Sequence, residues 1–289
     1  MSFREKLLSG KFTVTAEISP PKGTDVSGMM KEARIIKDAV DAVCVTDNQR
    51  AIMRMSPLAA CSALSQEGFE TIMHLTCRDR NRLGLQSELL GAAHLGIKNL
   101  LVMSGDYPTK GDHRGAKPVY DLDSVQLLDT ISSLNSGIDL SGNSLEGKTE
   151  FFSGAVSNTQ LTEVALMKFG KKIKAGARFI ITQAVFDAGR FSEFMDKIRD
   201  AGWKQTGIIA GIIPLRSEKS AQFLNKNIPG VKVPDDMIRR FASSSAPGAL
   251  GIELAADLIN ELRGICHGVH IMPIGTHENT RKILEMAGL

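Results

Sequence analysis

The 289-residue sequence predicts an α/β protein of the (β/α)8, or TIM-barrel, class, folded as a single domain over residues 1–289. Two observations predict this class. Short runs rich in β-branched residues alternate with amphipathic helical stretches almost to the end of the chain, with no clear linker between them. The predicted strands are near-continuous apolar runs, as expected when both faces of a parallel sheet are buried.

The predicted strands share this apolar character, and in chain order they cover 12–19, 42–46, 70–77, 99–104, 151–157, 179–186, 207–214 and 269–274. The predicted helices alternate with them and cover 26–39, a stretch following Pro57, 83–95, 124–134, 161–174, 190–200, 220–225, 247–264 and 278–287. Pro57 suits a first helical turn, where its missing N–H is not needed. Residues 135–150 are rich in Gly and Ser and predict a loop.

The main structural alternative is an open, doubly wound sheet. That fold places a glycine-rich turn directly after its first strand. The sequence after the first predicted strand is Ser-Pro-Pro-Lys-Gly at 19–23, which is not such a turn. The closed barrel is therefore favoured.

Composition limits the classes of function. The chain is 43% hydrophobic and 23% charged, which is ordinary for a globular protein, and a net charge of +3 gives no reason to expect nucleic-acid binding. The first ten residues are polar and the apolar segments are short, so we expect no signal peptide, no membrane span and a cytoplasmic location. The four cysteines form no CxxC pair or metal motif, which predicts reduced thiols and no metal site.

Polar residues gather where the predicted strands end, and in a barrel these carboxyl ends carry the chemistry. A buried strand should be apolar, so each polar group there needs a reason. The residues concerned are Glu17, Thr46, Asp47, Asn48, His74, Thr76, Ser104, Gly105, Asp106, Thr182, Gln183 and Asp187.

Each of four key residues also has a purely structural interpretation. Glu17 could be a buried carboxylate paired with a lysine or arginine, and Asp106 a turn residue. His74 could be a hydrogen-bonded core histidine, and Gln183 a tie between two strands. Their convergence on one end of the barrel favours a functional site, because structural networks have no reason to prefer that end.

These strand ends resemble those of the methylenetetrahydrofolate reductase family. The matching segments follow the family's order and span most of the chain: TAEISPPKG (15–23), CVTDN (44–48), HLTC (74–77), GIKNLLVMSGDYP (96–108), AGARFIITQAVFD (175–187) and GIIPL (211–215). The resemblance implies a (β/α)8 barrel that binds a flavin, FAD or FMN, at its mouth. It also implies reduction of 5,10-methylenetetrahydrofolate to 5-methyltetrahydrofolate by hydride transfer from the reduced flavin.

The resemblance further implies roles for individual residues. Glu17 matches the catalytic glutamate that protonates the folate ring nitrogen, Asp106 the aspartate between flavin and folate, and Gln183 the glutamine that positions the folate. The residues that fall at or near flavin-contacting positions are Thr46, His74, Ser104, Gly105, Asp106, Tyr120, Ser157, Lys171 and Lys172.

Four positions depart from the pattern of well-known bacterial relatives. Ser104 replaces an arginine, Ser157 falls near a flavin-contacting histidine, and Asp47 replaces an aromatic residue. Glu218 stands where those relatives place a phenylalanine that stacks on NADH. These changes leave FAD and FMN both possible, and the electron donor either NAD(P)H or a partner subunit.

Two alternative functions follow. One is a flavin barrel that serves as a subunit of a multi-subunit electron-transfer complex and does not use NAD(P)H directly. The other is a pterin-binding one-carbon transferase without flavin. We expect an oligomer or a complex subunit that binds neither nucleic acid nor a membrane.

Overall fold

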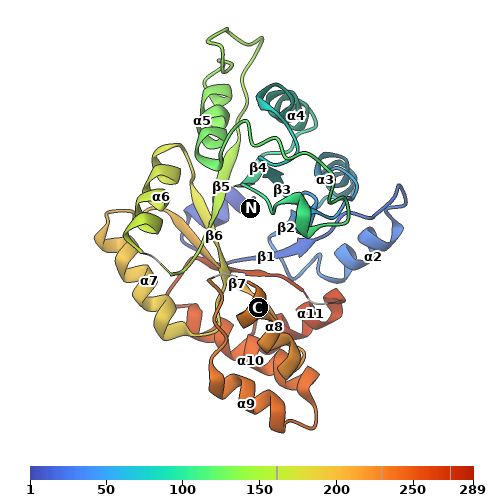
Figure 1. Cartoon of the computed structure of the whole chain (residues 1–289), viewed down its shortest axis with the longest axis vertical. Helices are drawn as coiled ribbons and strands as arrows, with labels where there is room; N and C mark the ends of the chain where they lie inside the picture. Colours follow the sequence, from blue (N-terminus) through green and yellow to red (C-terminus); the bar gives the residue numbers. More distant parts are fainter. Residues whose placement is uncertain (161, 229, 274) are drawn as a thin grey trace.

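The computed structural model describes residues 1–160, 162–228, 230–273 and 275–289. Eight parallel strands form a closed barrel in the order β1 to β8, each paired with its neighbours in the sequence and β8 with β1. Helices surround the strands on all sides (Figure 1). The predicted (β/α)8 fold is confirmed.

The strands begin within one residue of the predicted positions but several end earlier. They are β1 (Thr13–Ile18), β2 (Ala42–Val45), β3 (Thr71–Thr76), β4 (Asn99–Met103), β5 (Phe152–Ser157), β6 (Phe179–Ala184), β7 (Gly207–Ile212) and β8 (Gly268–Ile271). The hydrogen bonding between strands stops where the chain turns away from the barrel. The polar residues that follow each strand therefore lie on the rim of the barrel. Ile274, the predicted end of the last strand, lies outside the described residues.

The helices are α1 (Phe3–Leu8), α2 (Ser27–Ile35), α3 (Pro57–Gln66), α4 (Arg82–His94), α5 (Ser124–Asn135), α6 (Glu163–Lys174), α7 (Ala188–Asp200), α8 (Glu218–Asn227), α9 (Asp235–Ser243), α10 (Pro247–Leu262) and α11 (His277–Met286). Two short 3-10 turns, η1 (Gln49–Ala51) and η2 (Pro108–Lys110), lie in the loops after β2 and β4. Pro57 opens α3 as expected, and Ser56 Oγ caps it by accepting from the Leu58 amide at 3.2 Å. The sequence predicted a helix over 161–174, but Leu161 is not among the described residues. Helix α6 begins at Glu163 and is capped by Thr162.

Two helices were missed from the sequence. One is α1, which begins with a capping box between Ser2 and Glu5. Its Phe3 and Leu7 are buried in the amino-terminal end of the barrel, where Phe3 packs edge-on against Phe152 and Phe179. Burial of such a side chain stabilises a fold by about 1.5–3 kcal/mol. This helix therefore closes the barrel end opposite the predicted site.

The other missed helix is α9. Together with α8 and α10 it forms a lobe at the lower edge of the molecule in Figure 1. A separate apolar core holds this lobe against the end of β7, and it includes Phe186, Leu215, Leu224 and Phe241. No helix in the described part of the chain is long and apolar enough to cross a membrane.

The interior of the barrel changes character along its axis. Its amino-terminal half is filled by apolar side chains such as Phe152, Phe179 and Ile209. Its carboxyl-terminal half holds polar groups, among which the Thr15 hydroxyl lies 3.0 Å from His270 Nδ1. The predicted site residues lie on this polar side.

Candidate active site at the barrel mouth

Glu17 is the next-to-last residue of β1 and lies in register with Cys44 of β2. Its Oε1 accepts a hydrogen bond from the Gln49 side-chain amide at 2.7 Å. Burial raises the pKa of the Glu17 carboxyl to about 7, against the opposing effect of the Gln49 hydrogen bond. The interpretation of Glu17 as one half of an ion pair with lysine or arginine was wrong, because its partner is a neutral amide.

Thr46 directly follows β2 and His74 lies in β3, and both side chains are buried. Thr46 Oγ1 and His74 Nε2 have no hydrogen-bond partner in the described structure. Burial, together with the nearby His270, lowers the pKa of His74 to about 3, so its ring is neutral. An unpaired buried polar group costs about 1–3 kcal/mol. The interpretation of His74 as a fully hydrogen-bonded core histidine therefore fails at Nε2.

Asp47 has a structural partner set. Its carboxylate is buried and accepts from the Thr76 amide at 2.9 Å, from the Thr76 hydroxyl at 2.8 Å and from Arg80 at 3.0 Å. These contacts fasten the end of β2 to the end of β3. Asp47, which replaces an aromatic residue of the bacterial relatives, is thus paired with the cation of Arg80. Arg80 was not predicted from the sequence.

Arg78 is a second residue that was missed. Its side chain is only 2% exposed, pairs with Asp79 and donates to the backbone carbonyls of Asp106 at 3.1 Å and Asn48 at 3.2 Å. It therefore joins the loops after β2, β3 and β4. The available signal was the charged triplet at 78–80 directly after an apolar strand.

Gly105 and its neighbours form the rim after β4. Gly105 has φ +88°, and a Cβ there would lie 3.1 Å from the Thr76 Cβ, so glycine is required. The Tyr120 hydroxyl donates to the Gly105 carbonyl at 3.1 Å, and its ring stacks on Tyr107. Ser104 and Asp106 are exposed, and the Asp106 carboxylate lies 3.8 Å from Lys110 Nζ.

Gln183 stands on a β-bulge. The pairing of β6 with β7 shifts register between Ile181 and Ala184. Thr182 Oγ1 fills the gap by accepting from the Gly211 amide at 3.1 Å and donating to the Gln183 carbonyl at 2.8 Å. The Gln183 side chain is exposed at the mouth. Bulges of this kind re-aim a side chain next to active sites.

The remaining predicted residues near the ends of β5 and β6 differ in their burial and in their hydrogen bonds. Lys172 Nζ donates to the Val156 carbonyl at 2.7 Å near the end of β5, and burial lowers its pKa. Lys171 is exposed in the last turn of α6. The half-buried Ser157 donates to the Asn158 carbonyl at 3.1 Å. Asp187 is a helix cap that accepts from the Arg190 amide at 3.0 Å.

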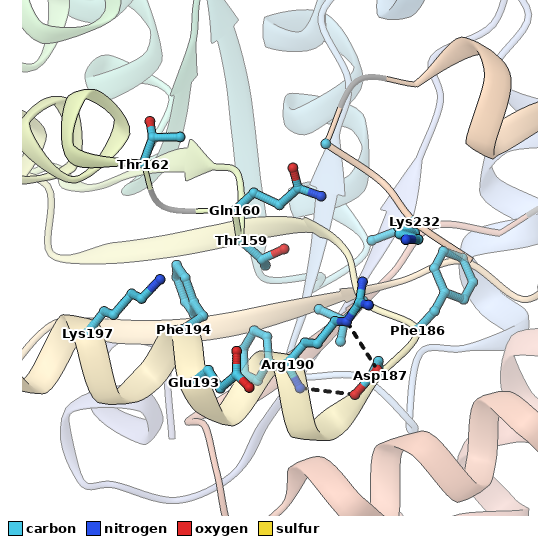
Figure 2. A pocket seen from close by; sticks show the side chains of 14 residues that line it. Thr159, Gln160, Thr162, Phe186, Asp187, Arg190, Glu193, Phe194, Lys197 and Lys232 are labelled. Carbon is cyan, nitrogen blue, oxygen red and sulfur yellow. Dashed lines mark hydrogen bonds and ion pairs between the residues drawn. The ribbon is translucent and has the colours of Figure 1, made fainter. Parts of the chain in front are cut away.

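A cavity of about 330 Å³ opens beside the ends of β5 and β6. Figure 2 shows Thr159 and Gln160 on one side of it, Lys232 and Phe186 on another, and the Asp187–Arg190 ion pair at its floor. Asp187 lines it, whereas Glu17, His74, Asp106 and Gln183 do not.

A family model described as methylenetetrahydrofolate reductase matches residues 2–288. The chain belongs to this family. The "5,10-methylenetetrahydrofolate reductase" of Pectobacterium carotovorum is 26% identical over 237 residues, which cover 81% of this chain and 74% of the relative. That of Salmonella typhimurium is 24% identical over 262 residues, covering 88% and 83%.

Eukaryotic relatives are longer. "Methylenetetrahydrofolate reductase 2" of Schizosaccharomyces pombe is 26% identical over 230 residues, which cover 75% of this chain but 35% of the relative. The chain thus spans about a third of that protein and of a Caenorhabditis elegans relative, of which 34% is covered.

Among solved structures, a Clostridium thermocellum protein described as binding two copies of 5-methyl-5,6,7,8-tetrahydrofolic acid superposes with a TM-score of 0.69. It is 16% identical, and the match covers 98% of this chain and 96% of that one. A riboflavin lyase superposes with a TM-score of 0.59 at 11% identity, covering 96% and 90%. Such likenesses establish the barrel fold alone.

Proposed function

We propose that the chain, acting as one catalytic domain over residues 1–289, reduces 5,10-methylenetetrahydrofolate to 5-methyltetrahydrofolate with a flavin cofactor in the cytoplasm. The observation that carries this proposal is Glu17, a carboxyl group at the barrel mouth whose pKa of about 7 lets it hold a proton at neutral pH. Family membership and the names of the two bacterial relatives support the same reaction.

The chemistry explains why such a carboxyl is needed. Opening the five-membered ring of the folate produces an electrophilic iminium carbon only if the departing nitrogen receives a proton. A protonated Glu17 would donate that proton, because a general acid works best when its pKa lies near the working pH. An ordinary exposed glutamate would be ionised and unable to do so.

The residues at the mouth fit a flavin. Thr46 Oγ1 and His74 Nε2 are buried polar atoms in need of partners, and Gly105 adopts a left-handed φ in which a side chain would be strained and crowded against Thr76 at the end of β3. When bound, a reduced flavin supplies the hydride. The residues proposed to hold it are Thr46, His74, Ser104, Gly105, Asp106, Tyr120, Ser157, Lys171 and Lys172. Of the two lysines, Lys171 is exposed, whereas Lys172 Nζ donates to the Val156 carbonyl near the end of β5.

Asp106 and Gln183 would act on the folate from the ends of β4 and β6, which lie on either side of β5. An exposed carboxylate at Asp106 favours the cationic iminium and disfavours extra negative charge on a nearby reduced flavin. The Gln183 amide offers both donors and an acceptor to the edge of a pterin. Its place on the bulge of β6 supports this role, because the bulge presents the amide at the mouth.

The electron donor is proposed to be a partner subunit rather than NAD(P)H. Glu218 begins α8, and its carboxylate accepts from Gln222 at 2.7 Å. A carboxylate offers no stacking surface to a nicotinamide and repels the phosphates of the dinucleotide. This position therefore favours a flavin subunit that receives electrons within a larger assembly.

The test is to purify the chain, record its absorption spectrum and identify the cofactor as FAD or FMN by mass spectrometry. The flavin would then be reduced anaerobically with dithionite and mixed with methylenetetrahydrofolate. We expect the flavin to be reoxidised, with formation of one methyltetrahydrofolate per flavin. A colourless protein that transfers a one-carbon unit would instead indicate the flavin-free transferase, and a flavin that stays reduced would refute the substrate.

A further inference from the structure

We propose that Gln49 is a positioning residue for Glu17. Its side-chain amide, held against the carboxyl group by a left-handed segment of backbone, orients that carboxyl and stabilises its ionised form. Gln49 would thereby set the pH above which folate ring opening slows. The catalytic part of this inference rests on the proposed function, whereas the contact itself does not.

The contact is short and directed. Gln49 Nε2 donates to Glu17 Oε1 at 2.7 Å across the gap between the end of β1 and the loop after β2. An amide N–H bonds more strongly to a carboxylate than to a neutral carboxyl, so this contact favours loss of the Glu17 proton. Burial acts in the opposite direction.

The backbone around Gln49 is held in an unusual conformation. Asn48, Arg50 and Ala51 have φ angles of 45°, 57° and 56°, in the left-handed region that residues other than glycine avoid. Such a conformation persists only where its surroundings enforce it. The Asn48 side chain provides one restraint, since its Oδ1 accepts from the Arg54 amide at 2.9 Å and its Nδ2 donates to Asp79 at 3.2 Å.

A second restraint comes from the loop after β4, through contacts that we call the Asp112 clasp. The Asp112 carboxylate accepts from the Met53 amide at 3.1 Å and pairs with Lys22 from the loop after β1. Gly111 packs so closely on Ala51 that a Cβ would collide with the Ala51 carbonyl. Three loops are thus fastened together on either side of Gln49.

The other groups around Glu17 do not replace this contact. Cys44 lies opposite on β2, and burial raises its thiol pKa well above the usual value. His277 at the start of α11 lies against the Glu17 backbone carbonyl, and burial lowers its pKa, while its amide donates to Glu32 at 2.7 Å. Burial therefore disfavours the charged form of both side chains. In the described structure, Gln49 is therefore the group that opposes the effect of burial on the Glu17 carboxyl.

Loss of the Gln49 donor should consequently make Glu17 a weaker acid, not a stronger one. Gln49→Met keeps the length of the side chain and removes the N–H. We expect the Glu17 titration and the alkaline limb of the folate half-reaction to move upward together by about half to one pH unit. A residue with only a structural role would change the rate without moving the limb.

The titration can be followed without folate by carbon NMR of protein labelled at the glutamate carboxyl carbon, with Glu17→Gln assigning the signal. Gln66→Met, an exposed change at the end of α3, is the matched control and should titrate as wild type. Asp112→Asn should loosen the clasp and raise the Glu17 titration midpoint by a smaller amount. This variant also provides a test if Gln49→Met does not fold.

An unchanged or lowered Glu17 midpoint in folded Gln49→Met, or in folded Asp112→Asn if Gln49→Met does not fold, would overturn the inference. If wild-type protein fails to reduce methylenetetrahydrofolate at any pH, the proposed function is refuted together with the catalytic consequence. In that case the NMR titration still decides separately whether Gln49 controls the carboxyl.

Discussion

Replacing Glu17 by glutamine should stabilise the fold at alkaline pH while it disables the folate reaction. The carboxyl has a pKa of about 7 in the folded chain against 4.5 as its ordinary value, because burial disfavours the ionised form. At about 1.4 kcal/mol for each tenfold change in proton affinity, this difference corresponds to an upper limit of about 3.5 kcal/mol. Glu17 lies at the mouth and keeps some contact with solvent, so we expect a gain of about 1–3 kcal/mol.

The sign follows from proton binding. Between pH 4.5 and about 7 the folded chain retains the Glu17 proton while the unfolded chain releases it, so wild-type stability falls as the pH rises through this window. Glutamine carries no charge and can still accept from Gln49. The variant should therefore differ least from wild type below about pH 4.5 and exceed it most above about pH 7.

Urea unfolding of both proteins at acidic and alkaline pH measures this difference directly. Glu146→Gln, in the exposed loop after α5, is the matched control and should show no such pH dependence. In the same variant, flavin content should be normal and the folate half-reaction slower by on the order of 10²-fold or more, since the transferable proton is gone. Equal stability of Glu17→Gln and wild type at alkaline pH, or a normal folate rate, would refute the reasoning.

Three further predictions test the rest of the proposed site. Asp106→Asn should slow folate reduction and raise the flavin reduction potential, because a negative charge near the flavin is removed; an unchanged potential in spectroelectrochemical titration would place Asp106 away from the flavin. Gln183→Ala should weaken folate binding by about 1–3 kcal/mol and leave flavin content alone; wild-type affinity by calorimetry would show that the amide does not contact the pterin. The isolated chain should be reduced only slowly by NADH because of Glu218, and rapid flavin bleaching in stopped-flow would contradict a partner as electron donor.

The barrel could be predicted from the sequence because its determinants are local. Apolar runs such as 99–104 and 179–186 have few alternatives to a strand buried on both faces. Helix α1 was missed because it has only six residues, although its Ser2–Glu5 capping box was a usable signal. Helix α9 was missed because its sequence, DDMIRRFAS, has only a short apolar face. That face is buried only through contacts within the lobe that α9 forms with α8 and α10.

The candidate site was predictable in its position but not in its contacts. Glu17 and His74 stood out as polar residues in apolar strands, and the structure places both on the polar side of the barrel. Gln49 did not stand out, because its contact with Glu17 depends on left-handed backbone in residues that ordinarily avoid it. Arg78 was likewise hidden, since an arginine in a loop is usually exposed and this one is buried by carbonyls from two other loops.

Phe3 and Leu7 of α1 close the amino-terminal end of the barrel, and apolar side chains such as Phe152 and Phe179 fill the half next to them. Substrate, product and electron donor would all have to pass through a single opening at the carboxyl ends of the strands. If the partner subunit delivers electrons at the same cofactor face, bound folate would block that delivery, so reduction of the flavin and reduction of the folate would take place in turn. Steady-state rates would then show parallel double-reciprocal lines, with inhibition by high folate that is relieved by more donor.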